Sequence, residues 1–127
     1  MERKPSQYVA LDLPRPISTN ALWRPRPGGM CKTVAYKDWL TEAGLVLNSQ
    51  RPGHVAGPYC ITIRVARGWR GDLDNAVKAV SDLLQVHSVI ENDRLAQRVI
   101  IERSDVPGVS VLVCSTTVGE LTGIQWR

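Results

Sequence analysis

Four residues in the middle of the chain have the types and the spacing to do chemistry on a phosphodiester. Asp72 and Asp74 are separated by one residue, Lys78 follows four positions later, and Asp93 comes after the same predicted helix. Carboxylate oxygens are the ligands that Mg²⁺ prefers, and the bound ion keeps several waters. A lysine near such carboxylates can meet a phosphate oxygen. If the carboxylates converge, this set of groups favours metal-assisted cleavage of a phosphodiester.

Each of these residues also has an ordinary structural explanation. Aspartate is a preferred helix N-cap, so Asp74 could simply cap the helix that follows. Asp93 lies in a segment whose composition is typical of turns. Lys78 is four residues from both Asp74 and Asp82, so surface ion pairs are an alternative to a role for Asp82 in orienting the ammonium group. Asp72 is harder to explain, because capping needs one carboxylate and two neighbouring carboxylates repel without a cation.

Basic residues are concentrated in the first part of the chain. Residues 1–71 hold 11 Lys/Arg against 4 Asp/Glu, whereas residues 72–127 hold 5 against 8. Such a division is typical of a protein that attracts a polyanion and brings a metal ion to it, although a merely basic domain is the alternative. Two groups that combine cations with an aromatic ring are candidates for DNA contact. They are Asn20, Trp23, Arg24, Arg26 and Lys32 in and beside a long loop, and Arg67, Trp69 and Arg70 before the acidic pair.

Both candidate groups have a structural alternative as well. The long loop at residues 14–29 is rich in proline, arginine and glycine, and it could be a solvated loop stiffened by its prolines. Trp69 could be a packing residue. Glu91 is a candidate auxiliary acid, for which a solvated turn residue is the favoured interpretation.

The elements that must position these residues follow from the hydrophobic pattern. The predicted strands are residues 8–13, a short one near 30–34, then 59–66, 97–103 and 109–117. The predicted helices are residues 35–49 and 74–87. This order predicts an α+β fold, a two-layer sandwich in which two helices cover one face of a mixed sheet. The length predicts a single domain over residues 1–127.

Composition excludes several other classes of site. Cys31, Cys60 and Cys114 are odd in number and far apart, so they predict structural thiols and no zinc pairing. His54 and His87 are isolated from any nucleophile motif. Apolar runs are too short to cross a bilayer and the start of the chain has no signal-like region. We therefore expect a cytoplasmic protein without a membrane partner.

The central segment resembles the RusA family of Holliday junction resolvases. The family pattern has an Asp-Leu-Asp-Asn run, a lysine three residues on, an aspartate four residues further, and another aspartate in the turn before the next strand. This chain has each of them at the expected spacing, in residues 72–75, Lys78, Asp82 and Asp93. Chain length and the early proline-rich loop with Asn20 are similar to the family as well.

The resemblance implies an endodeoxyribonuclease that depends on Mg²⁺, with Mn²⁺ as a substitute, and that acts in DNA recombination and repair. Asp72, Asp74 and Asp93 resemble the family's metal-binding catalytic carboxylates, and Lys78 resembles its catalytic lysine. The resemblance further implies a homodimer that binds branched DNA and resolves four-way junctions by paired symmetric nicks, in a bacterial cell or a phage-infected host.

Two other function classes stay open. One is a non-catalytic DNA-binding or architectural module, which would bind DNA equally well in EDTA or without Asp72. The other is an RNA-binding sandwich, which normally has aromatic residues on adjacent exposed strands. The predicted strands here carry almost only aliphatic residues.

Overall fold

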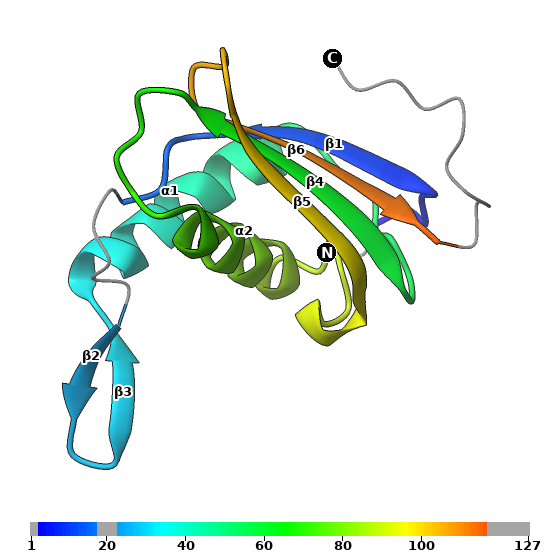
Figure 1. Cartoon of the computed structure of the whole chain (residues 1–127). Helices are drawn as coiled ribbons and strands as arrows, with labels where there is room; N and C mark the ends of the chain where they lie inside the picture. Colours follow the sequence, from blue (N-terminus) through cyan, green and yellow to red (C-terminus); the bar gives the residue numbers. More distant parts are fainter. Residues whose placement is uncertain (1–2, 18–22, 117–127) are drawn as a thin grey trace.

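The fold is given by a computed structural model that describes residues 3–17 and 23–116. In chain order the elements are β1 (Tyr8–Leu13), β2 (Trp23–Arg26), β3 (Gly29–Lys32), α1 (Val34–Ser49), β4 (Tyr59–Ala66), α2 (Leu73–Val86), the short 3-10 helix η1 (Asp93–Leu95), β5 (Ala96–Ser104) and β6 (Val109–Ser115). Four strands form one mixed sheet in the order β1-β6-β4-β5, and both α-helices lie on one of its faces (Figure 1). The predicted two-layer α+β sandwich is confirmed.

The connection from β4 through α2 to β5 decides where the candidate residues lie. β4 and β5 are parallel neighbours, with Tyr59 beside Ala96 and Ala66 beside Ser104. A parallel pair needs a crossover, and α2 supplies it by running back along the sheet. The start of α2 therefore lies near the end of β4, whereas η1 lies near the start of β4 and β5. Figure 1 shows the start of α2 and η1 at opposite ends of α2.

The core lies between the sheet and the two helices. It is formed by the alternate, inward-facing side chains of β4 and by the apolar side chains along one side of each helix. Ile61, Ile63 and Val65 of β4 are 2% exposed or less, and Val80 and Leu84 of α2 are completely buried. Burying an aliphatic side chain of this size contributes about 1.5–3 kcal/mol each. These contacts hold α2 rigidly against the sheet and so fix both of its ends.

One segment differs from the prediction. Residues 14–29 were expected to be a loop, but β2 and the first residue of β3 lie within them, and the two strands form an antiparallel hairpin. The hairpin extends away from the body of the molecule (Figure 1). Its turn uses Gly28 and Gly29 at φ 87° and 143°, a region that favours glycine. Proline and cations in β2 have low strand propensity, which is why the pattern did not indicate it.

The ends of the helices are set by local capping. The side chain of Thr33 accepts a hydrogen bond from Tyr36 N at 3.2 Å, so α1 begins directly after β3. The predicted strand near residues 30–34 therefore ends at Lys32. No helix in the described part of the chain is long and apolar enough to span a membrane.

Candidate active site at the start of α2

Asp72 and Asp74 lie on the first turn of α2 and both are exposed. The N-cap is Asp72, not Asp74, and the Asp72 side chain makes no capping hydrogen bond. Neither carboxylate forms an ion pair with the residues that the structure describes. Partial positive charge at the N-terminus of a helix favours negative groups there. Asp72 thus makes no capping bond, Asp74 lies where the helix favours a negative charge, and both carboxylates are accessible to a cation.

The segment that delivers Asp72 is held by a cation from β5. The guanidinium of Arg103 donates hydrogen bonds to the carbonyls of Trp69 and Gly71, the latter at 2.9 Å. It also lies 5.9 Å from the centre of the Trp69 ring, within the range of a cation–π contact. Arg103 was not among the predicted site residues, because its spacing in the strand gives no sign of these contacts. It is a positioning residue for the start of α2.

Trp69 is buried beside the segment that delivers Asp72. Its side chain is only 4% exposed, and its indole N–H donates to Pro16 O at 3.0 Å. A β-carbon on Gly71 would collide with the Trp69 ring, so glycine is required where the chain passes the indole. This burial favours the alternative for Trp69, a packing role, over direct contact with DNA. It links the segment after β1 to the segment before Asp72.

Lys78 and Asp82 form the predicted pair on α2. Lys78 Nζ lies 3.4 Å from Asp82 Oδ1, one helical turn away. The Tyr36 hydroxyl of α1 donates a hydrogen bond to the other carboxylate oxygen, Asp82 Oδ2. Burial raises the pKa of Tyr36 well above its usual range, and the bond to Asp82 raises it further, so the hydroxyl stays a donor. Asp82 is therefore held from two sides, and it limits the positions that the Lys78 ammonium can take.

Sequence reasoning missed Tyr36 as a part of this group, because it fits the apolar stripe of α1. A fully buried phenol usually needs a hydrogen-bond partner, and that requirement is the one signal in the sequence that could have pointed to it. The partner lies 46 residues away in the chain, so no local pattern identifies it.

Asp93 lies at the other end of α2. Its backbone N–H donates to the Gln85 side chain at 2.9 Å. Burial raises the pKa of Tyr59, the first residue of β4, to about 12, with a smaller contribution from the charge of Asp93. The 14 residues of α2 span roughly 20 Å at 1.5 Å per residue. The expectation that Asp93 converges with Asp72 and Asp74 within one chain is therefore wrong.

The positions of the other side chains that could bind a metal ion agree with the separation of Asp93 from Asp72 and Asp74. Within residues 3–17 and 23–116, no three Asp, Glu, His or Cys side chains come together as a group able to hold a metal ion. The physical reason is the crossover itself, which places the two ends of its helix at opposite ends of the parallel strands β4 and β5. One chain alone thus contributes a pair of carboxylates at the start of α2 and a separate carboxylate at η1.

Two of the predicted cations lie beside the acidic pair. Arg67 and Arg70 are exposed on the connection between β4 and α2. Arg67 is partly neutralised by Asp105, with Nε 3.0 Å from Oδ1. Arg70 lines a shallow groove of about 600 Å³, together with Arg15, Pro16, Ile17, Ala35, Gly68 and Trp69. The groove carries two arginines, and part of its lining, residues 68–70, comes just before the acidic pair in the chain. This arrangement suits contact with a phosphate backbone.

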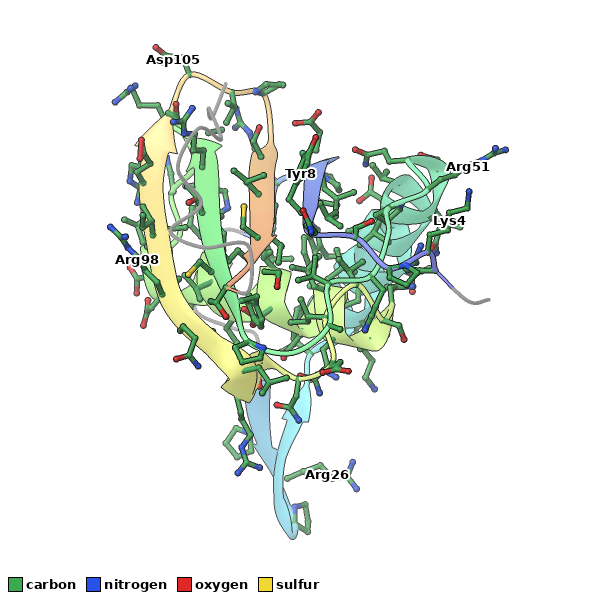
Figure 2. All side chains as sticks on the ribbon, turned by 90° about the vertical axis from the view of Figure 1, so that its right-hand side faces the viewer. Lys4, Tyr8, Arg26, Arg51, Arg98 and Asp105 are labelled. Carbon is green, nitrogen blue, oxygen red and sulfur yellow. The ribbon has the colours of Figure 1, made fainter. Side chains whose placement is uncertain are left out.

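The remaining predicted contacts are on the hairpin. Arg26, at the end of β2, projects from the side of the hairpin at a distance from the body of the molecule (Figure 2), and Lys32 is partly exposed at the end of β3. Trp23 and Arg24 are in β2, and Asn20 lies outside the described residues. The hairpin leads directly into the start of α1, on the same side of the molecule as the start of α2 (Figure 1).

No protein-family model matches the chain, and no curated protein matches it. Functional assignment therefore rests on the residues and their geometry. The described arrangement offers two accessible carboxylates, a lysine held by a second carboxylate, and a groove with two arginines on the neighbouring segment.

Proposed function

We propose that this chain is a metal-dependent endodeoxyribonuclease that resolves four-way DNA junctions. The observation that carries the proposal is the pair of exposed carboxylates, Asp72 and Asp74, which the start of α2 does not use for capping. Lys78 follows one turn later, and the spacing of all three residues resembles that of the RusA family. Two neighbouring carboxylates repel each other, and a bound cation would remove that repulsion.

Mg²⁺ fits the chemistry of this pair, since hard divalent cations take carboxylate oxygens and water. Asp72 and Asp74 would hold the ion, and Mn²⁺ would serve in its place. When bound, the metal would supply an activated water and neutralise charge on the phosphate. Lys78 would stabilise negative charge developing on a phosphate oxygen or assist the leaving oxygen. Asp82 and Tyr36 would keep the lysine ammonium in place.

Asp93 enters the same proposal through a second copy of the chain. The length of α2 separates it from the acidic pair of its own chain, so it can complete a three-carboxylate site only in another copy. In a two-fold symmetric dimer each copy gives and receives the same residue. The dimer would then carry two equivalent sites, as the symmetric nicking of a four-way junction requires.

Three exposed or groove-lining arginines support DNA as the substrate. Arg15 and Arg70 in the groove, with Arg26 on the projecting hairpin, would contact phosphates and set the position of the DNA. Such contacts provide affinity without reading sequence, and they weaken steeply with salt.

The proposal is tested with a labelled mobile four-way junction and a linear duplex of the same sequence, each incubated with Mg²⁺ or with EDTA. Paired symmetric nicks in the junction alone, present with Mg²⁺ and absent with EDTA, are the expected result. Tight binding without cleavage under Mg²⁺ or Mn²⁺ would instead favour a non-catalytic DNA-binding module. The separation of Asp93 from the acidic pair within one chain is the observation that keeps this second function in view.

A further inference from the structure

A basic cleft lies at the end of α1 that is opposite to the hairpin. It has a volume of about 650 Å³ and adjoins a second hollow of about 500 Å³, with which it shares Ser6 and residues 51–53. The chain before β1 forms one wall, and the loop after α1 forms the other. Among the described residues that line the two hollows are three cations, Arg3, Lys4 and Arg51, and no carboxylate. The cleft therefore has the charge to attract an anionic group.

Hydrogen bonds hold the two walls of the basic cleft together. The carbonyl of Lys4 accepts from His54 N at 2.8 Å. The guanidinium of Arg3 crosses between the walls: its Nε donates to His87 O at 2.7 Å, and its Nη1 donates to Pro52 O at 3.2 Å. Arg3 is thus used to fix the cleft, and the site is formed before any ligand binds.

Lys4 and Arg51 are the cations that the frame does not use. Both are exposed, and neither is part of an ion pair with the described residues. Figure 2 shows both side chains projecting from the same side of the molecule, near the end of α1. Their charges are therefore available to a ligand in the cleft.

The backbone of Arg51 adds a second observation. Arg51 directly follows Gln50, the C-cap of α1, and has φ 52°. Glycine or asparagine usually occupies this position after a helix, because a β-carbon makes the left-handed conformation unfavourable. An arginine at a position where glycine folds more easily favours a function for its guanidinium.

We propose that the basic cleft binds the phosphate backbone of a DNA arm through Lys4 and Arg51; the choice of DNA rests on the proposed function. The 16 residues of α1 span roughly 24 Å, which corresponds to about seven base pairs of duplex at 3.4 Å each. One arm therefore reaches from the hairpin at the start of α1 to the cleft at its end.

The exposed side of α1 between these two points repels phosphate. It carries Asp38 and Glu42 against a single cation, Lys37. Contact with the arm is therefore expected at the two ends of α1 and not along its length, so the cleft is a separate binding site and not an extension of the hairpin.

Binding of a labelled four-way junction in EDTA tests the cleft without cleavage. Arg51→Gly should keep or raise the melting temperature, since glycine adopts a positive φ without strain. It should also raise Kd for the junction several-fold and lower the slope of log Kd against log salt by about 1. Arg98→Gln removes one exposed cation from β5, at the other edge of the sheet, and should leave Kd and slope nearly unchanged. Equal effects of the two variants would overturn the proposal.

A hydroxyl-radical footprint tests the placement of the arm. The parent protein should protect two blocks of one arm, with their centres about seven base pairs apart. The double variant Lys4→Gln/Arg51→Gly should lose only the block further from the hairpin, and an unchanged footprint would overturn the proposal. Replacing chloride by inorganic phosphate at equal ionic strength should preserve both blocks. Loss of the further block alone would assign the cleft to free phosphate and overturn the assignment to DNA.

Cleavage assays on the same preparations separate this proposal from the proposed function. A protein that gives both protected blocks but cuts no junction under Mg²⁺ would refute the nuclease and leave the basic cleft as a DNA-binding site. A protein that cuts junctions, with Kd unchanged by Arg51→Gly, would refute the cleft alone.

Discussion

Two inactive variants, Asp72→Asn and Asp93→Asn, are expected to restore cleavage when they are mixed. Each substitution removes one carboxylate charge while keeping the shape of the side chain. Alone, each variant should be inactive, because every site in its dimer lacks one ligand. If each site takes the acidic pair from one chain and Asp93 from the other, a mixed dimer has one site with both defects and one site with none.

The expected recovery of cleavage in the mixture follows from the length of α2 and from the statistics of subunit exchange. The roughly 20 Å length of α2 excludes a shared site within one chain, so only mixed dimers can contain an intact site. Random exchange of equal amounts yields mixed dimers as about half of the total, each with one intact site of two. The mixture should therefore contain about a quarter of the intact sites of the parent protein.

Nicking of one strand is the appropriate assay, since a dimer with one intact site cannot make both cuts of a paired reaction. The variants are mixed, left to exchange, and added to the labelled junction with Mg²⁺. A mixture of Asp72→Asn with Asp74→Asn is the matched control, because both changes fall on the acidic pair of each chain. That control should stay inactive, since each mixed site keeps one defect.

No recovery in the Asp72→Asn and Asp93→Asn mixture, under conditions where mass spectrometry detects mixed dimers, would refute the shared site. Recovery in the control mixture would refute it as well.

Three further outcomes follow from the contacts around the site. Tyr36→Phe removes the donor to Asp82, so kcat for junction cleavage should fall several-fold with little change in KM, whereas a purely structural role would lower only the melting temperature. Gly71→Ala forces a β-carbon against the Trp69 ring and should lower the free energy of unfolding by about 1–3 kcal/mol in urea titrations; an unchanged midpoint would contradict the close packing. Burial lowers the pKa of His87 below its ordinary 6.5 in the folded state, so the unfolded state takes up the proton first as the pH falls. Stability should therefore decline from pH 7 to pH 5 and decline less in His87→Asn, which urea titrations at the two pH values would measure.

Much of the fold could be predicted because its hydrophobic patterns are local. Alternation marks β1, and a β-branched run marks β4; both have the predicted bounds. The hairpin of β2 and β3 could not be predicted in the same way, because Trp23–Arg26 holds a proline and two arginines. Its strands depend on pairing with each other, which no property of either segment alone indicates.

In the candidate site, the residues that are close in sequence could be predicted, whereas those brought in by tertiary packing could not. Asp72 and Asp74 are separated by one residue in sequence and so remain close together in any helix start. Asp93 was expected beside them because it follows the same helix, but a crossover helix separates its two ends by its full length. Arg103 and Tyr36 hold the site through bonds that span 32 and 46 residues of the chain, so their roles depend on tertiary packing.

The most direct test of the central claim measures binding and cleavage of one junction by three proteins: the parent, Asp72→Asn, and Asp38→Asn as a control on an exposed carboxylate of α1. We predict equal melting temperatures and junction binding for all three, with cleavage under Mg²⁺ by the parent and Asp38→Asn but lost in Asp72→Asn. Normal cleavage by a folded Asp72→Asn would show that the acidic pair at the start of α2 is not the catalytic site.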